Sequence, residues 1–149
     1  MAETVVCRME GKAADHFEKV TNAEPGAALI FKCSRKDAKI IVDDYFDSIS
    51  PGDLAEELAG DNRLVIYRCG WKLPDQSNRA APANLLVWFN PVESSDISIK
   101  RTYYPTMMDL LQKYPMLFKR EYQINNVADF SEDWLKKQNY LLHFDSDLK

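Results

Sequence analysis

A length of 149 residues, 46% of them hydrophobic and 28% charged, predicts a single folded domain and argues against general disorder. The net charge of −4, with acidic and basic residues interspersed, lacks the basic stripe that binds a phosphate backbone, so nucleic acid is excluded as the main partner. No apolar run approaches the roughly 20 residues that span a bilayer, and no basic region precedes the short apolar stretch at the N-terminus, so neither membrane insertion nor secretion is expected.

The first part of the chain predicts a helix, a β-hairpin and a second helix. Apolar residues at helical spacing over 9–20 predict an N-terminal helix with one face to bury. The apolar runs 27–33 and 38–42 are typical of a hairpin, and the acidic stretch 43–47 is expected to leave the sheet as a solvated loop. A Ser-Pro-Gly-Asp sequence, with a capping serine and proline at the first helical position, then predicts a short helix over 50–58.

Two strands and a loop are expected next. Residues 64–71 carry apolar side chains on both faces, as an interior strand covered on both sides requires. Residues 72–82 contain two prolines among small polar residues, and they predict an exposed loop. The run 85–89 is the most apolar of the chain and is expected at the centre of the core.

A long helix, a strand and a final helix complete the chain. Helical spacing over 94–114 is interrupted by Pro105, so this helix either kinks at Pro105 or begins its regular part there. Alternation over 118–124 predicts a strand with one buried side, and Asn126 is expected to cap the final helix. The tail 145–147 is expected to fray. This order of elements implies an α/β (α+β) domain whose central mixed sheet has helices on both faces.

The sequence contains no arrangement typical of catalysis or metal binding. His16 and His143 stand alone, and no C-x-x-C, H-E-x-x-H or glycine-rich phosphate loop occurs. Cys7, Cys33 and Cys69 are odd in number and widely separated, so they predict buried thiols in a reducing compartment. The spacing of Cys7 and His16 does not support a catalytic pair of nucleophile and base. We therefore expect no enzyme, no metal and no cofactor, but a module that binds another protein.

Several segments match one known family in the same order along the chain. Residues 49–54, Ile-Ser-Pro-Gly-Asp-Leu, are similar to an I-S-P-x-[DE]-L helix start. Residues 126–135, Asn-Val-Ala-Asp-Phe-Ser-Glu-Asp-Trp-Leu, are similar to an N-x-x-D-L-[ST]-E-E-W-L close. The other matches are 5–7, 28–32, 40–43 and 63–67. Together they resemble the glia maturation factors, a family of the actin-depolymerising factor homology (cofilin-like) superfamily.

The resemblance implies the cofilin-like fold over 1–149, with its core at about 5–140, and a role in actin networks. Glia maturation factors bind the actin-related protein 2/3 complex, dissociate filament branches and inhibit branch nucleation, and they bind actin itself weakly. A cytoplasmic monomer at the actin-rich cell cortex is the corresponding expectation. The binding surface of the superfamily, carried over position by position, consists here of Ala2, Glu3, Thr4, Lys100, Arg101, Thr102, Tyr104, Pro105, Met108, Val127, Asp129 and Ser131.

The long helix departs from the cofilin pattern K-M-x-Y-A-S-S-K-D. Arg101 and Tyr104 fit that pattern, whereas Pro105 and Met108 do not, and the loss of the second basic position argues against cofilin-like actin binding. Arg101 is the expected central contact, because a guanidinium forms paired hydrogen bonds and is enriched at binding hot spots. Met107 and Met108 belong either to the core or to the binding surface. The alternatives are a cofilin-like protein that binds and severs filaments and, more remotely, a small enzyme whose site the sequence hides.

Overall fold

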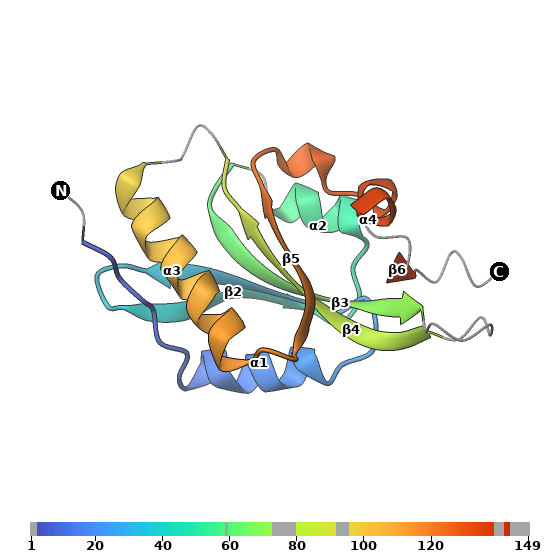
Figure 1. The fold of residues 1–149 in the computed structure, drawn as a ribbon, viewed down its shortest axis with the longest axis horizontal. Helices are drawn as coiled ribbons and strands as arrows, with labels where there is room; N and C mark the ends of the chain where they lie inside the picture. Colours follow the sequence, from blue (N-terminus) through green and yellow to red (C-terminus); the bar gives the residue numbers. More distant parts are fainter. Residues whose placement is uncertain (1–2, 59, 73–79, 92–95, 139–141, 144–149) are drawn as a thin grey trace.

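The computed structural model describes residues 3–58, 60–72, 80–91, 96–138 and 142–143 (Figure 1). In these parts the strands are β1 (Ala28–Ser34), β2 (Lys39–Phe46), β3 (Arg63–Lys72), β4 (Ala80–Phe89), β5 (Phe118–Ile124) and β6 (Leu142–His143). The helices are α1 (Lys12–Thr21), α2 (Pro51–Glu57), α3 (Ile97–Lys113) and α4 (Glu132–Gln138), with one turn of 3₁₀ helix, η2 (Val127–Asp129). None of the described helices is both long and apolar enough to cross a membrane.

The strands form one mixed sheet in the order β2-β1-β3-β4-β5. The pairs β2-β1, β1-β3 and β3-β4 are antiparallel, whereas β4 and β5 are parallel. A parallel pair needs a long crossover connection, and α3 lies in that connection. The short β6, which sequence reasoning did not predict, pairs with the far end of β3 at Gly70 and Trp71.

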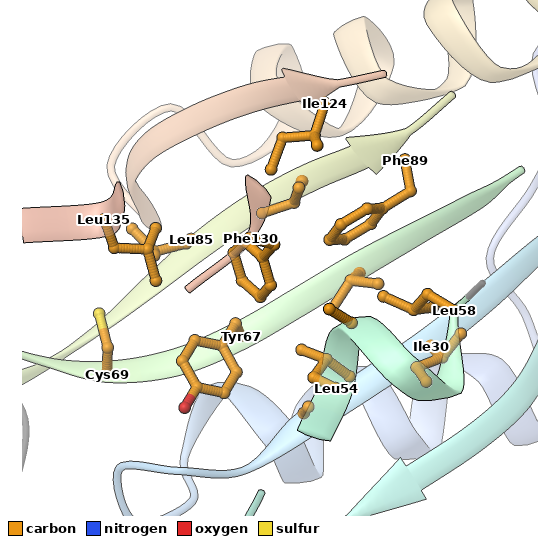
Figure 2. Close-up of a cluster of buried hydrophobic side chains, with 14 of the residues drawn as sticks. Ile30, Leu54, Leu58, Tyr67, Cys69, Leu85, Phe89, Ile124, Phe130 and Leu135 are labelled. Carbon is orange, nitrogen blue, oxygen red and sulfur yellow. The ribbon is translucent and has the colours of Figure 1, made fainter. Parts of the chain in front are cut away.

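Helices cover both faces of the sheet, as predicted, because the central strands point apolar side chains to both sides. Trp88 and Phe89 are neighbours in β4 and are both buried, yet they belong to separate clusters. The first, the α1/α3 cluster, contains Trp88 with side chains of α1, α3 and the sheet. The second, the α2/α4 cluster, contains Phe89 with Leu54 of α2 and Leu135 of α4 (Figure 2). This double burial confirms β3 and β4 as interior strands.

The acidic stretch 43–47 does not leave the sheet, which makes that prediction wrong. β2 continues to Phe46, and the pairing with β1 shifts at Asp43, which is an extra residue in β2. The Asp43 carboxylate lies 2.8 Å from the Arg63 guanidinium and 3.3 Å from the Lys32 ammonium group. These two basic side chains stabilise an acidic residue within an edge strand, so the charge run does not mark a loop.

β5 also departs from its predicted pattern. Phe118 pairs with Asn84 and Arg120 with Leu85, so Lys119 is an extra residue that reverses the side-chain alternation. Phe118 therefore packs on the α1/α3 cluster, whereas Ile124 is buried in the α2/α4 cluster. The strand buries side chains on two faces rather than on one.

Several segment boundaries differ from the predictions, and the N-terminal helix, predicted over 9–20, begins at Lys12. β4 begins at Ala80, so the predicted loop 72–82 is shorter at its end, and 73–79 lie outside the described residues. Asn126 accepts a hydrogen bond from the Ala128 amide and so opens η2 rather than the final helix. α4 is instead capped by Ser131, whose hydroxyl accepts a hydrogen bond from the Trp134 amide at 3.1 Å. The tail 145–147 also lies outside the described residues.

Candidate partner-binding surface

An extended segment at the N-terminus, residues 3–8, lies against α3 (Figure 1). We call it the N-terminal strip. The Val5 amide donates a hydrogen bond to the Arg101 carbonyl oxygen at 2.9 Å, and the Cys7 amide donates to the Thr106 hydroxyl at 3.0 Å. Further along, the Arg8 amide donates to the carbonyl oxygen of Ala38. The N-terminal strip is therefore bound at both ends, by α3 and by the β1-β2 hairpin.

Pro105 explains why an α3 carbonyl is available to the N-terminal strip. α3 runs without a break over Ile97–Lys113, so the helix does not begin at Pro105. Proline has no amide hydrogen, so the carbonyl four residues earlier, that of Arg101, lacks its usual partner within the helix. The Val5 amide is the donor that this carbonyl accepts instead. Pro105 thus removes one hydrogen bond from α3 and, by the same change, supplies the acceptor to which the N-terminal strip binds.

Arg35, in the turn between β1 and β2, joins the N-terminal strip to α3. Its guanidinium donates to the Thr102 hydroxyl at 2.9 Å, to the Ser98 carbonyl oxygen at 3.5 Å, and also to the Glu3 carbonyl oxygen. Sequence reasoning missed Arg35, because the turn Ser34-Arg35-Lys36-Asp37 is typical of a hairpin turn and its partners are far away in the chain. No local signal identifies it.

The outer face of α3 presents a stripe of predicted contact residues. Arg101, Tyr104 and Met108 follow each other at i, i+3 and i+7, a spacing that places them on one helix face. Tyr104 is 51% exposed, while Arg101, Pro105 and Met108 are half-buried. Lys100 beside them is exposed. Among the described residues, neither Lys100 nor Arg101 forms an ion pair with a carboxylate.

Thr102 does not belong to the accessible surface, so that prediction is wrong. Its side chain is 2% exposed and faces the core, with Tyr103 and Met107 on the same side of α3. The Thr102 hydroxyl donates to the Ser98 carbonyl at 2.7 Å and accepts from Arg35, so its polarity is satisfied internally. The two methionines, which the sequence left between core and surface, have different positions. Met107 is a core residue, and Met108 is half-buried on the outer face of α3.

The third predicted region, the turn before α4, lies over the opposite face of the sheet. Phe130 anchors it in the α2/α4 cluster, with edge-to-face contacts to Tyr67 and Phe89 at centroid distances of 6.2 and 5.2 Å (Figure 2). Asp129 is exposed, and Ser131 uses its hydroxyl as the α4 cap. The structure thus brings the N-terminal strip and α3 together. The predicted residues of this turn lie apart from them, on elements that pack over the other face of the sheet.

Two predicted residues remain partly or wholly outside the description. Ala2 precedes the described residues, and for Val127 only the backbone, in η2, is described. Glu3 and Thr4 are exposed members of the N-terminal strip. Within the part of the chain that the structure describes, no three His, Cys, Asp or Glu side chains lie together in a way that could hold a metal ion.

A mixed sheet between two helical layers, one of which carries a helix face with basic and aromatic side chains, places the protein in the α/β (α+β) class. The chain belongs to the family of cofilin/tropomyosin-type actin-binding proteins, whose model matches residues 6–139. Within this family it is similar to glia maturation factors, as the resemblance implied. The similarity to the Drosophila melanogaster glia maturation factor is 25% identity over 139 residues, or 91% of this chain and 97% of that protein.

Two further relatives agree with this assignment. Human glia maturation factor beta is 24% identical over 128 residues, covering 85% of this chain and 84% of that protein. The solution structure of the Caenorhabditis elegans glia maturation factor has a TM-score of 0.75 and 16% identity, covering 93% of this chain and 99% of that one. The cofilin-like fold is therefore confirmed.

Proposed function

We propose that this protein acts by binding the actin-related protein 2/3 complex, promoting the loss of filament branches and inhibiting branch nucleation. It performs no catalysis and needs no cofactor. The observation that supports this most directly is the outer face of α3, where Tyr104 is 51% exposed and the half-buried Arg101 forms no ion pair with a carboxylate among the described residues. Arginine and tyrosine are enriched among residues that dominate binding energy. The protein would act as a monomer in the cytoplasm, at the actin-rich cortex.

Each residue of the stripe has a distinct role in this proposal. The Arg101 guanidinium forms paired hydrogen bonds with a carboxylate or carbonyl group of the partner. The Tyr104 ring contributes apolar area and a hydroxyl, while the flexible Met108 side chain adapts to a shallow apolar groove. Glu3 and Thr4 of the N-terminal strip extend the contact at one side, whereas the exposed Asp129, on the turn that packs over the other face of the sheet, is a second and separate contact.

Debranching requires that the protein bind one conformation of the complex better than another. A ligand shifts a conformational equilibrium only by its difference in affinity for the two states. We infer that binding favours the conformation that has lost its hold on the parent filament. The N-terminal strip is already docked on α3 through Val5 and Cys7, so little binding energy is lost in ordering it.

The decisive experiment compares a charge-reversal variant with a matched control. Lys100→Glu with Arg101→Glu should weaken binding to the purified complex at least tenfold, because two partner-facing charges change sign. Its free energy of unfolding should change by about 0.5 kcal/mol or less, since both substitutions lie at the surface. Lys119→Glu with Arg120→Glu makes the same charge change on exposed positions of β5 and should bind normally.

Three measurements separate the alternatives. Fluorescence microscopy of branched networks should show faster branch loss with the wild-type protein than with the α3 variant. Unimpaired binding by the α3 variant would eliminate the proposed surface. Strong co-sedimentation with unbranched filaments, with no binding to the complex, would instead favour a cofilin-like severing protein.

A further inference from the structure

Two thiols that are distant in the sequence meet between the N-terminal strip and the sheet. Cys7 is 2% exposed and belongs to the α1/α3 cluster, and the half-buried Cys33, near the end of β1, packs on that same cluster. The Cys7 sulfur lies 3.6 Å from the carbonyl oxygen of Ser34, the neighbour of Cys33, and the two thiols are near enough for each to shift the pKa of the other. Cys69 is buried in the α2/α4 cluster, on the other face of the sheet.

The surroundings make the two thiols chemically unequal. The hydrogen bond from Cys33 lowers the pKa of the Cys7 thiol to about 7, against the opposing effect of burial. The Thr106 hydroxyl and the positive charges of Arg35 and Arg8 add to this lowering. The pKa of Cys33 is raised, because its interaction with Cys7 and its burial both favour the protonated thiol. Cys7 is therefore the thiolate and nucleophile of the pair, and Cys33 is the proton donor.

We propose that a low-molecular-weight disulfide of the glutathione type oxidises Cys7 and Cys33 to an intramolecular disulfide that fixes the N-terminal strip to the β1-β2 hairpin. The Cys7 thiolate attacks one sulfur of the small disulfide and displaces one thiolate, which takes up a proton. Cys33 then loses its proton and attacks the Cys7 sulfur, which displaces the second small thiol. The protein gives up two electrons and two protons, and the small disulfide receives them as two thiols.

Access to Cys7 depends on local opening of the N-terminal strip. The strip is bound through a few backbone hydrogen bonds, among them those of Val5 and Arg8, and such short segments open far more often than the whole domain. Oxidation captures the closed arrangement, because the new bond joins the strip covalently to β1. The proposed contact residues Glu3 and Thr4 are then tethered beside α3. Only this last consequence rests on the proposed function; the disulfide itself does not.

The test uses the full chain with oxidised glutathione at neutral pH. The intact mass should fall by about 2 Da, the two hydrogens lost on disulfide formation, and peptide mapping without reductant should join the peptides of Cys7 and Cys33. Closing this loop should raise the melting temperature by roughly 5–10 °C, because the cross-link restricts the unfolded chain. The Cys69→Ser variant should behave like the wild type, whereas Cys33→Ser should keep its two hydrogens and stop at a mixed disulfide.

Several results would overturn the proposal. A wild-type protein that keeps its mass, a bond that involves Cys69, or a cross-linked form that melts at a lower temperature would each do so. Binding to the actin-related protein 2/3 complex is measured separately on the reduced protein. Failure of that binding would remove the proposed function and leave the disulfide intact, whereas normal binding without disulfide formation would remove only the present proposal.

Discussion

Replacing Pro105 with alanine tests whether the proline is what makes α3 a docking site for the N-terminal strip. The substitution supplies an amide hydrogen at position 105, and the Arg101 carbonyl oxygen is the acceptor that helix geometry assigns to it. The Val5 amide, now 2.9 Å from that oxygen, would have to share it. We therefore expect α3 to become more stable and the start of the N-terminal strip to become less firmly bound.

The expected magnitudes follow from the two hydrogen bonds concerned. Proline in a helix interior costs about 3 kcal/mol relative to alanine, but part of that cost is already offset because Val5 satisfies the Arg101 carbonyl. The free energy of unfolding should therefore rise by only about 1–2 kcal/mol. A neutral hydrogen bond contributes about 1 kcal/mol, so weakening that of Val5 should increase its opening about fivefold.

Hydrogen exchange measured by NMR reads both effects in one sample. The Val5 amide should exchange about fivefold faster in Pro105→Ala, while the Arg8 amide, bonded to the Ala38 carbonyl, should keep its rate. Gln112→Ala, an exposed substitution on α3, serves as the control for a general change in helix propensity. Unchanged exchange at Val5, or a loss of stability in Pro105→Ala, would refute the reasoning.

Three further substitutions test other parts of the structure. Phe130→Ala removes a ring that is 1% exposed and should lower the free energy of unfolding by about 3–5 kcal/mol in urea titrations. Burial acts to raise the pKa of Asp43, but the Arg63 guanidinium holds it, and the pKa of Asp61, below the usual range. The stability that these carboxylates add is present above about pH 4 and is lost as the pH falls, so Arg63→Gln should flatten this acid-side loss. Arg35→Ala should free the N-terminal strip for proteolysis and cost about 1–3 kcal/mol.

Each of these three predictions has a result that would contradict it. A Phe130→Leu variant as unstable as Phe130→Ala would show that the ring volume is not the cause. An acid-unfolding curve of Arg63→Gln parallel to that of the wild type would mean that its two carboxylates are not stabilised by the guanidinium. Cleavage of the N-terminal strip at the wild-type rate in Arg35→Ala, with Lys36→Ala as the matched control, would show that the turn does not bind it.

The fold was predictable where the signal is local. The helix over 9–20, the apolar runs of β1, β3 and β4, and the capped start at Ser50 depend on side-chain periodicity and turn chemistry within a few residues. The two register shifts were not predictable in this way. The extra residue Asp43 forms an ion pair with Arg63 of the distant strand β3, and the extra residue Lys119 is evident only from the pairing of β5 with β4.

The candidate surface was predictable only in part, because residue type does not reveal which face of α3 points outward. Arg101 and Tyr104 were carried over from a motif and do lie on the outer face. Thr102, a polar residue of a type usually found at the surface, is buried, and its hydroxyl is satisfied by hydrogen bonds within α3 and to Arg35. The role of Arg35 cannot be predicted from the sequence, since it depends on three segments that meet only in the folded protein.

The contacts of α3 explain how the fold accommodates Pro105, which departs from the cofilin pattern. A helix that lacks one amide leaves a carbonyl without its helical partner, and such a carbonyl needs another donor. The Val5 amide is that donor, so the Arg101 backbone is bound internally while its guanidinium stays available to a partner. The N-terminal strip and α3 consequently form one continuous surface before any partner arrives. Substitutions on the two segments should then be non-additive in their effects on binding, as expected for residues that share a hydrogen-bond network.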